Sequence, residues 1–294
     1  MGECKICGGK SHRVIYQGDI RSGAFGSVRE DAEISECETC GVQRLAESCC
    51  LPDSHYETEA YRKKLQQALD GESYYRVHDE QQEHWLRALR RLEIRGKSLA
   101  DVGCGAGSFV DHISGLVSEV IAIEPFQMYQ KILVDKGYKA YPYAKSAAAD
   151  GVKVDCAVSF QVIEHVSDPV AFLSETRGIM KDDGILVVST PNQNDILMTL
   201  LPEDYPAFFY RDVHRWYFDQ ASLETCAKRA GFEVDSVSFI HRFGLSNTLF
   251  WLKHRAPKGR VRADGIDEVI DSNWVSYLED RGKADTLVVV LRAC

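Results

Sequence analysis

Ser98-Leu99-Ala100-Asp101-Val102-Gly103-Cys104-Gly105-Ala106-Gly107-Ser108-Phe109 joins a short apolar run to an acidic residue and three alternating glycines. The pattern predicts a buried strand, a tight turn and the start of a helix. Glycines accept positive φ and put no Cβ between backbone and ligand, while the first helical turn presents free N–H groups. The stretch therefore predicts a ligand across the turn, although a glycine turn that only packs a helix on a sheet fits the same residues.

The spacing of the glycines argues against a dinucleotide cofactor. A dinucleotide fingerprint has its third glycine three positions after the second, whereas Gly107 follows Gly105 by two, which disfavours a nicotinamide oxidoreductase. A second apolar run, residues 120–123, ends in Glu124. An acidic side chain about 20 residues after the turn, at the tip of the neighbouring strand, can accept hydrogen bonds from both hydroxyls of a ribose.

Apolar runs and helical patterns alternate from Leu99 onward, which is typical of a doubly wound α/β sheet with helices on both faces. The order of motifs up to Phe239 also resembles the class I S-adenosylmethionine-dependent methyltransferases of small molecules, including quinone O-methyltransferase-like sequences. The resemblance rests on D-x-G-x-G-x-G at 101–107, Q-V-I-E-H-V at 161–166, D-P at 168–169, D-D-G at 182–184 and T-P-N at 190–192.

The resemblance implies a mostly parallel, seven-stranded Rossmann-like sheet that binds S-adenosylmethionine. It implies that strands at 232–239 and 287–291 form an antiparallel pair. The segment between them is longer than a hairpin loop and contains two helical patterns, which predict a cap. The cofactor site that it implies consists of Asp101, Gly103, Gly105, Gly107, Glu124, Pro125, Phe126, Ala144 and Gln161.

Four of the ten cysteines form two C-x-x-C-G knuckles, Cys4 with Cys7 and Cys37 with Cys40. Each knuckle can turn two thiolates toward one cation, and together they complete a tetrahedral, structural Zn²⁺ site. The gap between the knuckles exceeds the roughly 15–20 residues of compact sites, which predicts a small sheet around residues 18–26. Unrelated cysteine pairs are the alternative, and the other six cysteines are interpreted as free thiols.

The double knuckle resembles the zinc-binding module of deoxysugar C-methyltransferases. That family carries a further C-terminal domain for which these 294 residues leave no room, a departure that weakens the case for C-methylation of a keto sugar. In those enzymes a loop supplies a histidine base preceded by an acidic residue, and His214 aligns with that histidine. Val213 stands immediately before it, so Asp212 can replace the acidic residue only imperfectly. His165, in the Q-V-I-E-H-V motif, is the other candidate base.

Three regions follow from these motifs: a zinc-binding module at 1–50, a helical linker or lid at 51–98, and a methyltransferase domain at 99–294. Within the second, an amphipathic helix should end near Gly96, and residues 74–78 either cover the cofactor or pack on the zinc module. Within the third, a cap insertion at about 241–285 should bind the acceptor or form a subunit contact. The second alternative would make the protein a homodimer.

Charge and hydropathy narrow the function. A net charge of −9 gives no basic field for nucleic acid, and the sequence shows neither a signal segment nor a membrane span, so we expect a cytoplasmic enzyme. We expect methyl transfer to a small-molecule acceptor, foremost a hydroxyl of a sugar or nucleotide-linked sugar. C- or N-methylation of another metabolite, and a non-catalytic binding protein on a methyltransferase scaffold, are the alternatives.

Overall fold

The computed structural model describes residues 2–23, 25–64 and 68–294. Its larger sheet has seven strands in the spatial order β10-β11-β8-β7-β4-β5-β6, and β11 is the strand that runs antiparallel to its two neighbours. Their bounds are Ser98–Val102 (β4), Glu119–Ile123 (β5), Lys139–Tyr141 (β6), Val154–Phe160 (β7), Met180–Pro191 (β8), Phe232–Ile240 (β10) and Thr286–Ala293 (β11). The predicted doubly wound, mostly parallel sheet is confirmed.

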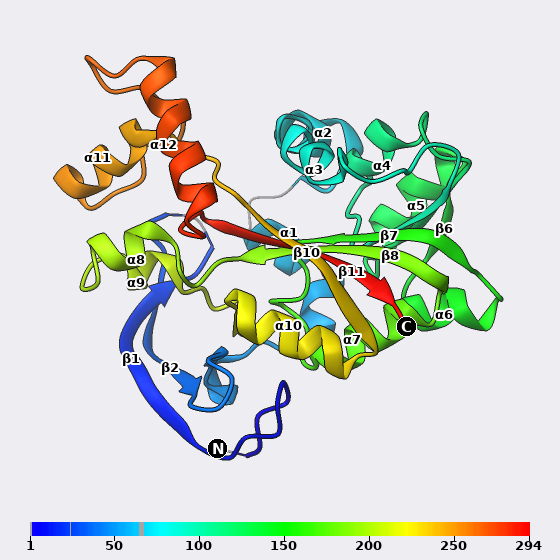
Figure 1. The fold of residues 1–294 in the computed structure, drawn as a ribbon, viewed down its shortest axis with the longest axis horizontal. Coiled ribbons are helices and arrows are strands. Elements are labelled where there is room, and N and C mark those ends of the chain that lie inside the picture. The colour runs from blue at the N-terminus through cyan, green and yellow to red at the C-terminus, as the bar shows by residue number, and fades with distance from the viewer. Residues whose placement is uncertain (1, 24, 65–67) are drawn as a thin grey trace.

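Helices cover both faces of this sheet (Figure 1). One layer consists of α2 (Gly71–His78), α3 (Gln82–Leu89), α4 (Ser108–Ile113) and α5 (Gln127–Asp135), and the other of α6 (Ala144–Ala149), α7 (Pro169–Arg177) and α10 (Gln220–Arg229). Successive strand residues alternate between the layers: Leu99 packs with α3 and α4, whereas Ala100 packs on the α7 side. Burial on both faces explains why these strands read as continuous apolar runs.

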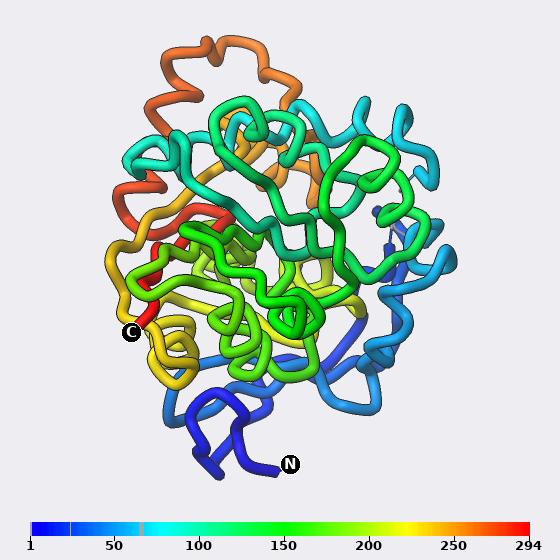
Figure 2. Tube along the Cα trace, turned by 90° about the vertical axis from the view of Figure 1, so that its right-hand side faces the viewer, coloured from blue at the N-terminus to red at the C-terminus, as the bar shows by residue number. Residues whose placement is uncertain are grey.

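A smaller sheet holds the N-terminal region. It consists of β1 (His12–Arg21), β2 (Val28–Cys37), β3 (Gln43–Leu45) and β9 (Trp216–Tyr217), all antiparallel. The β1–β2 hairpin confirms the predicted sheet around residues 18–26, but β9 comes from the aromatic segment at 205–218. The N-terminal segment lies against the α7 and α10 layer (Figure 2), where Cys4 and Cys37 join the main core.

The connection between the two sheets passes over the glycine turn. It contains 3₁₀ turns at Glu47–Cys49, Asp53–Glu57 and Asp79–Gln81, and helix α1 (Glu59–Lys64). Tyr74 of α2 packs with Ala106, Phe126 and Tyr129. The segment at 74–78 therefore covers the predicted cofactor turn rather than the zinc module. Helix α3 ends at Leu89, earlier than the expected end near Gly96.

The predicted cap lies between β10 and β11 and forms α11 (Leu245–His254) and α12 (Glu268–Asp280), which extend beyond one end of the sheet (Figure 1). Its Trp251 packs on Tyr205 and Phe208, in a segment that contains α8 (Ile196–Leu200) and α9 (Pro206–Phe209). Strand β8 begins at Met180, before the D-D-G motif at 182–184, because Asp183 adopts φ 58° and shifts the register without ending the strand. None of the helices in the described ranges is long and apolar enough to cross a bilayer.

Candidate functional site

A cavity of ≈ 930 Å³ opens at the carboxyl ends of β4, β5 and β7, where open α/β sheets bind ligands. Most of the residues that the sequence singles out line it: Asp101, Gly103, Gly105, Glu124, Pro125, Ala144, Gln161, His165 and His214. Three others lie outside its lining, namely Gly107, Phe126 and Asp212. One cavity thus brings together most of the predicted cofactor residues and both candidate bases.

Glu124 is the best-defined polar group of this site. Its carboxylate accepts the Gly105 N–H at 3.0 Å and the Phe126 N–H at 2.8 Å. The guanidinium of Arg62, on α1, lies 2.9 Å from the same carboxylate. Burial raises the pKa of Glu124, although these three donors oppose the shift. The N–H donors fix the carboxylate at the end of β5, and Arg62 connects it to the covering helices.

Two glycines of the turn have different tasks. A Cβ on Gly105 would lie 2.2 Å from the hydroxyl oxygen of Tyr74, so this position needs glycine to let the covering helix approach. A Cβ on Gly107 would lie 2.6 Å from Leu133, which places that glycine in the packing of α4 on α5. Both adopt positive φ, 57° and 88°. Gly105 therefore shapes the cavity, whereas Gly107 shapes the helix behind it.

Gln161 has a strained backbone at the end of β7. Its φ is 59°, in the left-handed region that non-glycine residues rarely adopt. The amide side chain donates to the hydroxyl of Ser189 at 3.3 Å, and its backbone N–H donates to the Ser189 carbonyl at 3.0 Å. Such strain concentrates at ligand sites because the surrounding structure must hold it. The conformation supports a binding role for this predicted residue.

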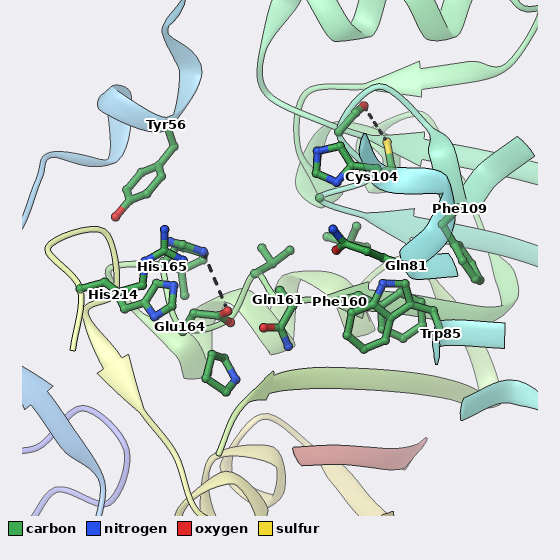
Figure 3. A pocket seen from close by; sticks show the side chains of 18 of the residues that line it. Tyr56, Gln81, Trp85, Cys104, Phe109, Phe160, Gln161, Glu164, His165 and His214 are labelled. Atoms are coloured by element: carbon green, nitrogen blue, oxygen red, sulfur yellow. Dashed lines mark hydrogen bonds and ion pairs between the residues drawn. The ribbon is translucent and has the colours of Figure 1, made fainter. Parts of the chain in front are cut away.

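Glu164, His165 and His214 form a polar cluster on the cavity wall (Figure 3). One ligand atom from each lies within 4.8 Å of the others, and the two imidazole centroids are 4.7 Å apart. His165 Nδ1 donates to the Val213 carbonyl at 2.7 Å, which leaves its Nε2 with a lone pair, 3.9 Å from Glu164. Glu164 Oε1 and His214 Nδ1 are buried without a partner among the described residues.

Burial sets the protonation of this cluster. It lowers the pKa of His165 to about 3 and lowers the pKa of His214, and the positive charge of Arg211 adds to both shifts. Burial raises the pKa of Glu164 to about 8. Both imidazoles are therefore neutral at pH 7, the state in which a histidine can accept a proton.

Asp212 does not support His214 as the sequence suggested. Its carboxylate accepts a hydrogen bond from the Ser22 hydroxyl at 2.8 Å and pairs with Lys64. The acidic residue beside the histidines is Glu164, which the sequence analysis did not select. The available signal was its position directly before His165 in Q-V-I-E-H-V.

Asp101 and Asp195, together with Glu164, are buried carboxyls that make the free energy of unfolding depend on pH. Burial raises the pKa of Asp101 to about 8, helped by the charge of Glu124. Burial and the charge of Asp285 raise the pKa of Asp195 to about 7. All three carboxyls bind their protons more tightly in the folded state than in the unfolded chain. Their contribution to stability is thus complete below about pH 4 and is lost as the pH rises through about 7 to 8.

We expect the free energy of unfolding to fall by on the order of 2–3 kcal/mol between pH 7 and 8.5 as Asp101, Asp195 and Glu164 ionise, measured by urea denaturation. Histidines do not mask this change, because they are largely neutral in both states above pH 7. Asp101→Asn should make the profile less steep, since an amide does not titrate, while Glu164 and Asp195 keep their share of the dependence. An unchanged slope in that variant would show that another group causes the dependence.

The four knuckle cysteines converge on one point. The Sγ atoms of Cys4 and Cys40 are 3.8 Å apart, those of Cys7 and Cys37 are 3.6 Å apart, and all four lie within 4.8 Å of one another. A tetrahedron with Zn–S bonds of about 2.3 Å has edges of ~3.8 Å. The Gly9 N–H donates to the Cys7 sulfur at 3.3 Å, as suits a thiolate. The residues fit a Zn²⁺ ion in both donor type and spacing.

A family model described as a methyltransferase domain matches residues 76–237. The chain belongs to this methyltransferase family. A probable S-adenosylmethionine-dependent methyltransferase of Mycolicibacterium smegmatis is 30% identical over 214 residues, which cover 67% of this chain and 77% of the relative.

A ubiquinone biosynthesis O-methyltransferase of Rhodopseudomonas palustris (strain TIE-1) is 32% identical over 156 residues, or 47% of this methyltransferase. The match spans 62% of that relative's length. Among solved structures, the magnesium protoporphyrin IX methyltransferase of Synechocystis with bound S-adenosylhomocysteine has a TM-score of 0.50 at 11% identity. The match covers 82% of this chain and 97% of the Synechocystis chain, and at 11% identity the similarity shows the fold alone.

Proposed function

We propose that this protein transfers a methyl group from S-adenosylmethionine to a hydroxyl of a small-molecule acceptor, foremost a sugar or nucleotide-linked sugar. The observation that carries the proposal is the shared cavity, in which the Glu124 carboxylate and the Gly105 turn face the same space as two neutral imidazoles. Membership of the methyltransferase family supports S-adenosylmethionine as the methyl donor. The resemblance of the zinc module and the His214 segment to deoxysugar C-methyltransferases supports a sugar as the acceptor.

Bound S-adenosylmethionine would supply an electrophilic methyl group on a positively charged sulfonium. Glu124 would accept hydrogen bonds from ribose hydroxyls, and the exposed backbone of Gly103 and Gly105 permits close approach. Asp101, with its raised pKa, is suited to a cationic group of the ligand, because a nearby positive charge returns such a carboxyl to its ionised form. Tyr74 and Arg62 cover this half of the cavity and exclude water.

A hydroxyl acceptor must lose its proton during transfer, so this chain needs a base beside the acceptor. We assign that role to His214, which lines the cavity and is neutral at pH 7. His165 is held by the Val213 carbonyl, and it orders the segment on which His214 lies. Glu164 lies beside both imidazoles. Its carboxyl is mostly protonated at pH 7 because burial raises its pKa to about 8, but a protonated imidazole beside it would favour the ionised carboxylate, which would then stabilise that imidazolium.

The Cys4, Cys7, Cys37 and Cys40 site would hold Zn²⁺ as a structural ion. Four thiolates fill a tetrahedral shell and leave no position for water or substrate. Gly8 and Gly41 follow the two knuckles with φ 77° and 76°, which turns each loop back over its sulfurs. The ion would tie the N-terminal turn to β2, and through β3 to the strand β9 next to His214.

Glu124→Gln should weaken S-adenosylmethionine binding by about 1–3 kcal/mol, the loss expected when a charged acceptor becomes neutral. Glutamine keeps the side-chain volume, whereas alanine would also remove the atoms that contact Arg62 and the two backbone N–H donors. Isothermal titration calorimetry measures the change, and Glu119→Gln, at the exposed start of the same strand, is the matched control. Equal affinity in both folded variants would contradict the placement of the cofactor.

The proposed activity is tested by mass spectrometry. Purified protein incubated with methyl-deuterated S-adenosylmethionine and a panel of sugars and nucleotide-linked sugars should yield an acceptor carrying the label, and fragmentation identifies the methylated atom. Label on carbon or nitrogen would replace O-methylation with the corresponding alternative. Cofactor binding with no labelled product, including from small molecules extracted with the native protein, would favour a non-catalytic binding role.

A further inference from the structure

Two arginines lie side by side on the cavity wall next to the histidine cluster. Arg21 is the last residue of β1, and Arg211 lies between α9 and β9. The Arg21 N–H donates to the Tyr210 carbonyl at 3.0 Å, and the Asp212 N–H donates to the Arg21 carbonyl at 3.1 Å, so the two segments form a parallel bridge. Both arginines line the cavity.

Neither guanidinium has a carboxylate partner within the described ranges. The Nε atoms of Arg21 and Arg211 are buried and lack acceptors there. The Arg21 guanidinium carbon lies 4.1 Å from the centroid of the Phe208 ring, a contact that leaves its N–H groups unused. Guanidinium groups carry five donors each, so this arrangement leaves several donors without a protein acceptor.

The nearby acids do not neutralise the pair. Asp212 is held by Ser22 and Lys64, and Asp285 pairs with Arg242 at 3.1 Å. Burial raises the pKa of Glu164 to about 8, so that carboxyl is mostly neutral at pH 7. Burial and the charge of Arg211 lower the pKa of Arg21 to about 10, which still leaves it charged. A protein with a net charge of −9 thus concentrates uncompensated positive charge in its cavity.

We propose that Arg21 and Arg211 bind an oxyanion of the acceptor, a phosphate or a carboxylate. Adjacent like charges that are half-buried are costly unless a ligand neutralises them, and the planar guanidinium fork matches both oxyanions in bidentate geometry. The inference rests on the proposed function, because it assigns the anionic group to the molecule that is methylated. The backbone N–H of His214 donates to the Arg211 carbonyl at 3.1 Å, so the two residues lie in the same turn. Because the oxyanion site and the proposed base are this close, the oxyanion and the reacting hydroxyl belong to one compact acceptor.

The test uses inorganic phosphate and malonate as probes, titrated separately into the 294-residue chain by calorimetry at low ionic strength. We expect one site per chain, and at least tenfold weaker binding in Arg211→Gln and in Arg21→Gln. Arg211→Lys should bind the anion with an affinity between those of the wild type and Arg211→Gln, since lysine keeps the positive charge but lacks the planar guanidinium fork. Arg13→Gln is the matched control, because Arg13 is an exposed arginine of the same strand that pairs with Glu36. Tighter phosphate binding assigns a phosphorylated acceptor, and tighter malonate binding a carboxylated one.

Thermal melting separates lost binding from lost folding. Without added anion, Arg211→Gln should melt at or above the wild-type temperature, since one of two repelling charges is gone. No binding to the wild type, or equal binding to wild type and both glutamine variants (an adventitious ion only), would overturn the inference. A parallel titration with S-adenosylmethionine keeps the two proposals distinct: cofactor binding without anion binding refutes only the arginine site, whereas anion binding without cofactor binding refutes the methyltransferase proposal.

Discussion

His214→Ala should reduce turnover by about 10²–10⁴-fold, the usual contribution of a positioned base, while S-adenosylmethionine affinity stays nearly unchanged. The expectation follows from the place of His214 on the acceptor side of the cavity, apart from Glu124 and the glycine turn. Its imidazole is neutral because burial lowers its pKa. The measurement is the rate of product formation at saturating cofactor, with cofactor affinity determined separately.

Two further histidine variants make this result specific. His165→Ala should reduce turnover less, or disturb cofactor binding as well, because that imidazole holds the Val213 carbonyl and lies on the segment after β7. His254→Ala, at the end of α11, is the control outside the cavity. A greater loss in His165→Ala than in His214→Ala would move the base to His165. Little loss in either would mean that positioning alone suffices, as for an amine or thiolate acceptor.

Cys37→Ser should abolish zinc binding and strongly lower the yield and melting temperature of the protein. Structural zinc contributes apparent binding energies of about 10–16 kcal/mol in small zinc-binding peptides, which here would be shared with the packing of the N-terminal sheet. Cys37 also packs in the main core with Cys4. Losing the ion should therefore disturb the contact between the N-terminal sheet and the α7 and α10 layer.

Metal analysis of freshly purified protein should find one zinc ion per chain, and a chelator should lower the melting temperature of the wild type. Cys294→Ser is the control, because Cys294 is an exposed free thiol far along the chain from the knuckles. Wild-type protein that contains no zinc, or a Cys37→Ser variant as stable as Cys294→Ser, would refute the structural metal site.

The sequence sufficed to predict the main sheet because its strands are short apolar runs that both faces bury. Two helix starts have a local chemical signal in the sequence: Asp168 caps α7 by accepting the Ala171 N–H, and Asp219 forms a capping box with Ser222 at the start of α10. The positions of Glu124 and Gln161 followed from the rule that ligand residues gather at the carboxyl ends of parallel strands.

Sequence patterns could not predict the contacts between segments that are far apart in the chain. Strand β9 is only two residues long and pairs with β3 across the molecule, so no periodicity could reveal it. The partner of Glu124 is Arg62, in a charged helix with no distinctive motif. Arg21 and Arg211 become neighbours only through a bridge between the two loops that carry them. The Asp212 carboxylate contacts Ser22 and Lys64, because closeness in sequence to His214 does not determine the direction of its side chain.

The most direct test of this account is calorimetric titration of the purified wild-type chain with S-adenosylmethionine. The account predicts binding to one site per chain, with affinity lowered in Glu124→Gln and retained in Glu119→Gln. Absence of binding to folded, zinc-loaded protein would contradict it. The cavity at Asp101, Gly105 and Glu124 would then bind no cofactor, and the proposed methyl transfer would lack its methyl donor.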